Sequence, residues 1–156
     1  MFLALWPAHW SRTQRSNATL IAALLLMVLV LSLLGQFLSY FPEPIGSNAE
    51  LFAEGALTTL YLTLVSGAAG LVLGTGAALA RTSRLAWLRW IASFYIWAIR
   101  GTPLLVQILF VYFALPVLVP GLNLPDFAAA VVALGLNAGA YNAEAIRAGL
   151  LAVPRG

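Results

Sequence analysis

Six polar side chains in the second half of the chain are the residues whose types and spacing could do chemistry. They are Gln107, Asn137, Tyr141, Asn142, Glu144 and Arg147. Polar groups set among apolar residues either bond neighbouring helices or line a path for a polar solute. The first four are therefore candidates for lining a translocation path, although each also fits a structural bond between helices. The last two, three residues apart, can pair with each other on a helix.

Catalytic and metal-binding signatures are missing from the sequence. There is no G-x-x-x-x-G-K-[ST] phosphate loop and no H-E-x-x-H, and the only histidine is His9. The absence of cysteine excludes disulfides, thiol catalysis and cysteine-ligated metals. A proton relay through Glu144 is a further hypothesis, but no second acid in the apolar runs could take its proton. We predict no cofactor, no metal and no enzymatic activity for the chain.

The composition sets the class of protein. Of 156 residues, 62% are hydrophobic and only 8% are charged, whereas a soluble domain has about 25% charged residues. The apolar runs are continuous rather than alternating in segments of about ten residues, which favours transmembrane helices over a transmembrane barrel. We predict an all-α integral membrane protein.

Four apolar runs, separated by charged or breaker-rich segments, divide the chain. We predict a head at 1–16, a first transmembrane helix at 17–41, an external loop at 42–54, and further transmembrane helices at about 56–80, 103–119 and 126–144. A secretory signal peptide is the rival interpretation of the first run. Its apolar core would be about 7–15 residues long, so the longer run at 17–41 favours an uncleaved helix.

The charges predict the orientation in the membrane. All eight arginines fall in residues 1–16, 81–101 and 144–156, while four of the five acids lie in 42–54 and 117–126. Positive residues are retained on the cytoplasmic side. Both ends of the chain are therefore predicted to be cytoplasmic.

Residues 83–100 carry an aromatic stripe beside a second apolar stripe at helical spacing. The aromatic stripe consists of Trp87, Trp90, Phe94 and Trp97. Tryptophan and arginine prefer the depth of the membrane interface, so we predict one cytoplasmic interfacial helix at about 83–100. The alternative is that Trp90–Ile99 lengthens the third transmembrane helix inward.

The break between this helix and the third span is the segment Arg100, Gly101, Thr102 and Pro103. Threonine can cap a helix, and proline suits the first helical position because its missing N–H costs nothing there. We therefore predict that Thr102 caps a helix beginning at Pro103. The segment is interpreted as structural, an anchor at the cytoplasmic boundary.

Small residues recur every four positions on the second and fourth transmembrane helices. Gly70 and Gly74 form a G-x-x-x-G on the second, and Gly135 and Gly139 repeat it on the fourth. Such ridges allow the backbones of two helices to approach closely. Packing within the chain is the favoured interpretation, and a dimer interface is the alternative.

Two longer strings carry a resemblance to a known family. They are Arg100-Gly101-Thr102-Pro103-Leu104-Leu105-Val106-Gln107 and Ala140-Tyr141-Asn142-Ala143-Glu144-Ala145-Ile146-Arg147. Together with Gly55–Leu60, they make residues 55–156 resemble the permease subunit of bacterial polar amino acid ABC importers, the histidine/glutamine/arginine permease group. The resemblance implies a type I importer (ABC transmembrane type-1) fold, and it marks Arg100–Pro103, Glu144 and Arg147 as family motif residues.

The resemblance also implies partners. They are an ABC ATPase subunit on the cytoplasmic side, an external solute-binding protein and a second permease subunit, all acting at the bacterial inner membrane. Transport would proceed by alternating access, with ATP hydrolysed by the separate ATPase subunit.

Family members continue beyond Val153-Pro154-x-Gly156 with an E-A-A…G coupling loop, so the chain is expected to be a C-terminally incomplete permease domain. The competing hypothesis is a small four-helix membrane scaffold without transport of its own. The resemblance does not imply which amino acid is carried.

Overall fold

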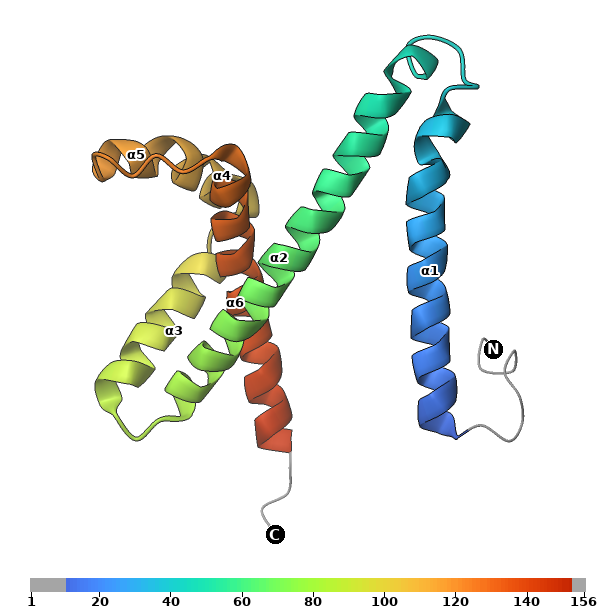
Figure 1. Cartoon of the computed structure of the whole chain (residues 1–156). Coiled ribbons are helices and arrows are strands. Elements are labelled where there is room, and N and C mark those ends of the chain that lie inside the picture. Colours follow the sequence, from blue (N-terminus) through green and yellow to red (C-terminus); the bar gives the residue numbers. More distant parts are fainter. Residues whose placement is uncertain (1–10, 153–156) are drawn as a thin grey trace. The chain divides into compact units, whose positions relative to one another are not determined.

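The structure, a computed structural model, describes residues 11–152, and these residues form helices without any strand (Figure 1). Residues 1–59 and 60–156 form two compact units, and the division falls inside helix α2 (Ala49–Thr82). Most of the predicted head at 1–16 lies outside the described residues.

Helix α1 (Arg12–Leu38) belongs to the first unit and begins before the predicted start at residue 17. A capping box explains the earlier start. The Gln14 N–H donates to the Ser11 hydroxyl at 3.2 Å, and the Ser11 N–H donates to Oε1 of Gln14 at 2.9 Å. No side chain of α1 is buried, as expected for a helix whose apolar surface faces lipid.

A compact turn joins α1 to α2 and is shorter than the predicted loop at 42–54. It contains the short helix η2 (Gly46–Asn48), and the Asn48 side chain donates to the Pro44 carbonyl at 2.7 Å. A Cβ on Gly46 would stand 2.2 Å from the Phe41 carbonyl oxygen, so only glycine fits there. Because α2 begins at Ala49, the C-terminal part of the predicted loop is helical.

In the second unit, helix α3 (Ala86–Arg100) is followed by a break and then by α4 (Leu104–Leu109). The chain bends by 107° between the helices on the two sides of this break (Figure 1). Consequently α3 does not extend α4 in line. We call residues 100–103 the elbow.

A π-helical segment, η3 (Phe110–Ala114), follows α4 and passes into α5 (Leu115–Leu118). The cause is Pro116, which has no N–H to bond the carbonyl of Tyr112 and whose ring would clash with that carbonyl. Widening the preceding turn relieves both problems. The predicted third helix at 103–119 is therefore three short pieces.

Helix α6 (Asp126–Ala152) follows an exit loop in which Gly121 has a φ of 93°, a value that favours glycine. The hydroxyl of Tyr112 donates to Oδ1 of Asp126 at 2.9 Å and closes this loop onto the start of α6. The helix continues beyond the predicted end at residue 144.

Two small apolar clusters make the core of the second unit. Ala78, Ile96 and Ala143 join α2, α3 and α6. Val111, Ala129 and Ala133 join η3 to α6. Small side chains dominate both clusters, so the helices are close together, while the large apolar side chains remain exposed on the outside.

The all-helical class is as predicted. Within the described residues, α1 and the stretch Gly46–Thr82 are long and apolar enough to cross a membrane. The bent pair formed by α3 and α4–α5 would count as a third span if its halves cross together. Helix α6, which covers the predicted fourth transmembrane helix at 126–144, is not among the helices that are long and apolar enough by this measure.

Candidate functional site

The glycines of α2 and α6 bring the two backbones into contact. A Cβ on Gly70 would stand 2.6 Å from the Cβ of Ala138, and one on Gly74 would stand 2.6 Å from the Cβ of Asn142. Gly139 is crowded from α3, since its Cβ would lie 2.7 Å from the Tyr95 hydroxyl oxygen. Gly135 has more room, with its nearest neighbour, the Cβ of Ala69, at 3.4 Å. Both ridges therefore pack within the chain.

The predicted cap at the elbow, Thr102 on a helix that begins at Pro103, is wrong. Pro103 occupies the N-cap of α4 with a ψ of 138°, and no side chain caps the helix. The Thr102 hydroxyl instead donates backward to the carbonyls of Ala98 at 3.0 Å and Ile99 at 3.3 Å. Proline disfavours a helical conformation at the residue before it, so the chain breaks at Thr102 and this side chain serves the end of α3.

Gln107 is buried, and its side chain closes the elbow. Its amide nitrogen donates to the Ile99 carbonyl at 2.7 Å and to the carbonyl and hydroxyl oxygens of Thr102, each at 3.0 Å. Its amide oxygen accepts from the Asn137 side chain at 3.2 Å. The two amides therefore tie the end of α3 and the start of α4 to the middle of α6.

The four candidate path residues do not form one lining. Gln107 and Asn137 bond each other between α4 and α6. Tyr141, on α6, faces the end of α3, where the Arg100 guanidinium stands 5.2 Å from the centroid of the Tyr141 ring. Asn142 lies on the side of α6 that meets Gly74. Asn137 and Tyr141 are thus one turn apart on the same face of α6, whereas Asn142 lies on another side of the helix.

Glu144 is the centre of a charged cluster at the C-terminal part of α6. One carboxylate oxygen pairs with Arg81 at the end of α2. The other accepts from Arg147 at 2.9 Å and 3.1 Å. The predicted i, i+3 pairing within α6 is therefore present, and the longer-range pair with Arg81 connects α6 to α2.

A hollow of about 510 Å³ lies in the bend of the elbow. Its wall is almost entirely apolar and comes from the end of α3, from α4–α5 and from α6. Gln107 and Thr102 are the polar residues on this wall, and both are already hydrogen-bonded. Within residues 11–152, no group of three or more His, Cys, Asp or Glu side chains gathers to hold a metal.

Two contacts between distant parts of the chain do not follow from the sequence. Arg81 pairs with Glu144, which lies 63 residues further along the chain. Tyr95 donates from its hydroxyl to the Leu136 carbonyl at 2.6 Å, which joins α3 to α6. The hydroxyl of Tyr95 on an otherwise apolar helix face is the feature of the sequence that indicates a hydrogen bond to a neighbouring helix.

The fold has a counterpart among solved structures. It matches a chain of a crystal structure described as an amino acid ABC transporter with histidines, with a TM-score of 0.65 and 44% sequence identity. The match covers 69% of this chain and 50% of the other. The protein is therefore an all-helical membrane protein with the fold of an ABC transporter permease.

The sequence agrees with this class. The chain is 43% identical over 106 residues to an L-cystine transport system permease of Bacillus subtilis, covering 68% of this chain and 44% of that protein. It is 47% identical over 103 residues to an arginine transport permease of the same organism, covering 66% and 47%. A glutamine transport permease of Escherichia coli is 43% identical over 107 residues, covering 68% and 48%.

The chain is thus a homologue of amino acid ABC transport permeases, as the two sequence strings predicted. It spans about half the length of the curated relatives that it matches. No family model matches the chain.

Proposed function

We propose that this chain is the membrane-spanning subunit of an ATP-driven importer for amino acids. The observation that carries the proposal is its identity of 43% to 47% with permeases named for cystine, arginine and glutamine. Because these relatives are named for three different amino acids, the proposed substrate is the class rather than one member. ATP would be hydrolysed by a separate subunit.

The packing in the second unit supports a role in alternating access. The elbow is tied to α6 by Gln107, and α6 is tied to α2 by Glu144. A rearrangement at the end of α2 or α3 would therefore move α6 as well. A chain in which side-chain bonds join several helices suits a protein that switches between two packed states.

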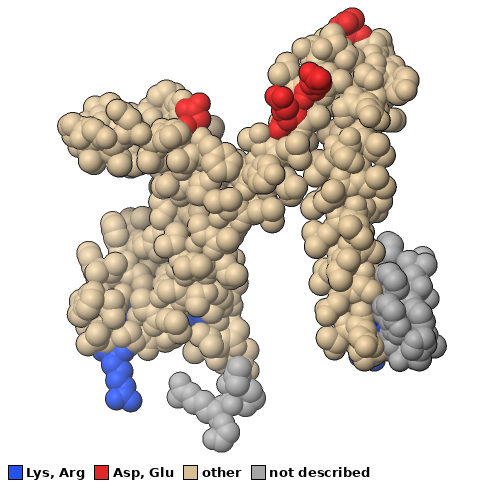
Figure 2. Space-filling model, viewed as in Figure 1, with Lys and Arg blue, Asp and Glu red and all other residues tan. Residues whose placement is uncertain are grey.

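We propose that the arginine-rich end of the second unit faces the cytoplasm of a bacterium, in the inner membrane. Arg81, Arg84 and Arg89 lie around the α2–α3 turn, and Arg81 pairs with Glu144 near the C-terminal end of α6, whereas Asp126 begins α6. Basic and acidic side chains accordingly lie at opposite ends of this unit (Figure 2). The positive-inside rule supports this orientation. The ATPase subunit would dock on this side, and a solute-binding protein would act on the other, with a second permease subunit alongside.

The path residues remain a proposal. Gln107 and Asn137 satisfy each other, so we assign them first to holding the elbow. Tyr141 is 52% exposed and Asn142 is partly exposed, so these two are the better candidates for meeting a polar solute.

Assembly tests the proposal. The chain, expressed in its own reading frame with its cognate ATPase subunit and second permease subunit, should co-purify with both in mild detergent. A matched variant, Glu144→Ala, should recover less ATPase because it disturbs the charged end of α6. If the wild-type chain purifies without any ATPase although all subunits are present, the proposal fails.

A further inference from the structure

Three arginines around α3 have no acidic partner in the part of the chain that the structure describes. Arg84 precedes the helix, Arg89 lies in its first turn and Arg100 ends it, and none of them forms an ion pair. The nearby carboxylate of Glu144 is already bonded to Arg81 and Arg147. The α2–α3 turn, where Arg84 and Arg89 lie, therefore carries positive charge that no acid in the described residues balances by an ion pair.

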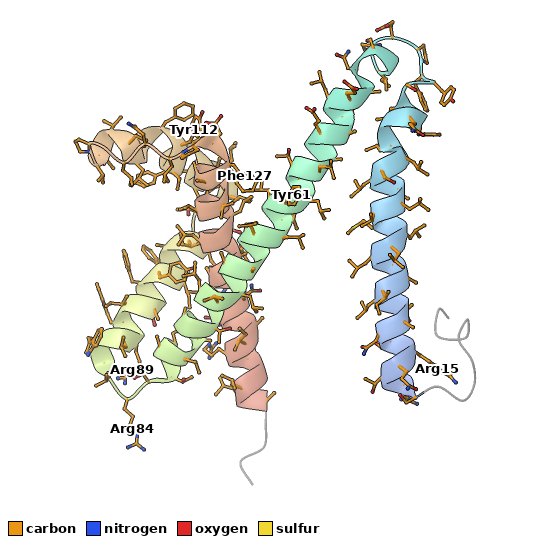
Figure 3. The ribbon with its side chains drawn as sticks, in the orientation of Figure 1. Arg15, Tyr61, Arg84, Arg89, Tyr112 and Phe127 are labelled. Atoms are coloured by element: carbon orange, nitrogen blue, oxygen red, sulfur yellow. The ribbon has the colours of Figure 1, made fainter. Side chains whose placement is uncertain are left out.

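Two of these arginines lie together at the α2–α3 turn. The Arg84 side chain extends away from the turn (Figure 3). Arg89 is held close by, since its Nη1 donates to the carbonyls of Ser83 and Arg84, each at 2.9 Å. Only one of its three guanidinium nitrogens is used in this way, so it can still bind an anion. Arg100 is set apart because its guanidinium lies over the Tyr141 ring.

The aromatic stripe of α3 starts beside this pair. Trp87, Trp90, Phe94 and Trp97 are between 54% and 72% exposed. Ala92 and Ile96, on the opposite side of the helix, are buried against the rest of the unit. The Trp90 and Phe94 rings stack with centroids 5.7 Å apart. An exposed, ordered aromatic face flanked by arginines suits the headgroup depth of a bilayer.

We propose that Arg84, Arg89, Trp87 and Trp90 form a docking surface for the headgroups of anionic phospholipids. The two guanidinium groups would bind the phosphate oxygens of the headgroups, while the indole rings lie against the glycerol and upper acyl region. Charge complementarity selects an anionic partner, and the aromatic face selects one attached to a membrane rather than a soluble anion. The inference goes beyond the proposed function, since it needs the chain to be in a membrane but not to transport.

Lipid enrichment around the chain tests this surface. The chain is reconstituted in nanodiscs of equal parts phosphatidylcholine and phosphatidylglycerol, extracted in mild detergent, and its retained lipids are counted by mass spectrometry. Wild type should retain phosphatidylglycerol in excess over phosphatidylcholine. Each of Arg84→Gln and Arg89→Gln should lower this preference by up to about fivefold, the effect of roughly 1 kcal/mol per basic residue at an anionic surface.

Three controls separate the alternatives. Arg84→Lys keeps the charge and should keep most of the preference for phosphatidylglycerol. This variant shows whether the loss in Arg84→Gln comes from the missing charge rather than from misfolding after replacement of the arginine. Arg147→Gln removes an arginine already paired with Glu144 and should leave the preference unchanged. Excess soluble glycerol phosphate should not displace the retained lipid. Equal retention of both lipids by wild type, an unchanged ratio in the double glutamine variant, or displacement by glycerol phosphate would each overturn the proposal.

Discussion

The side-chain nitrogen of Asn137 donates a hydrogen bond to the side-chain oxygen of Gln107 at 3.2 Å. This bond joins the middle of α6 to the first turns of α4. Since the other end of the Gln107 amide is bonded to Ile99 and Thr102, one buried side chain serves three helices. The elbow therefore depends on a polar group rather than on apolar packing alone.

Replacing this amide should destabilise the second unit. Gln107→Leu leaves the Thr102 carbonyl and the Asn137 amide without this partner and removes one of the donors to the Ile99 carbonyl, which costs about 1–3 kcal/mol. The thermal unfolding midpoint in detergent should fall accordingly. Gln36→Leu, on exposed α1, is the matched control and should change the midpoint little. Equal midpoints for the two variants would show that the amide does not hold the elbow.

Adding a methyl group at the α2–α6 contact should also destabilise the fold. In Gly70→Ala the new Cβ would stand 2.6 Å from that of Ala138, and such overpacking costs about 1–3 kcal/mol. Gly76→Ala on the same helix is the control, because no atom lies within 4 Å of its Cβ. Alanine there should be neutral or stabilise by about 0.5–1 kcal/mol. Denaturant unfolding distinguishes the two, and a tolerated Gly70→Ala would contradict the close contact.

Removing the Glu144 charge should loosen α6 from α2. In Glu144→Gln both Arg81 and Arg147 lose their partner. Because all three side chains are only 22% to 34% exposed, we expect a loss of about 1–2 kcal/mol, between surface and buried pairs. Glu50→Gln, an exposed acid on α2, is the control. The loss should shrink at high salt, where the wild-type pairs are screened, and a loss insensitive to salt would argue against an ionic cause.

Releasing the backbone at the elbow should change its angle. Pro103→Ala removes the restriction on Thr102 and allows α3 and α4 to align more closely. The chain contains no cysteine, so spin labels at Ile91→Cys and Val117→Cys report the distance between the two arms directly. The distance distribution should broaden and shift to longer values than in the Pro103 parent. We expect amino acid preference to be unchanged, and a switch in preference would mean that the elbow contacts substrate.

Much of the fold follows from the composition of particular stretches. The solid apolar runs predicted helices because a bilayer requires every backbone group to be satisfied within the helix. Glycines at intervals of four predicted the close approach at Gly70 and Gly74, since spacing alone places them on one face. The two family strings also predicted the class of protein, because both occur in one chain, in order and at the spacing of the family.

Other features depended on contacts between segments distant in sequence. Arg81 and Glu144 are 63 residues apart in the sequence, and their ion pair joins α2 to α6. No local sequence pattern predicts this pair. The sequence predicts that Thr102 caps the following helix, yet its hydroxyl donates to carbonyls at the end of the preceding helix. A threonine between two helices can bond to either one, and the sequence does not distinguish the two. The π segment before Pro116 arises from one missing N–H and one steric clash. The hydrophobicity of the run, from which the helix was predicted, is sensitive to neither effect.

ATP-dependent uptake tests the central claim most directly. The chain, in its own reading frame, is reconstituted in proteoliposomes with its cognate permease, ATPase and solute-binding partners, and labelled amino acids are supplied on the binding-protein side. We predict accumulation of at least one amino acid that requires hydrolysable ATP on the ATPase side and stops with a non-hydrolysable analogue. Complete assembly with no ATP-dependent uptake of any amino acid would contradict the account.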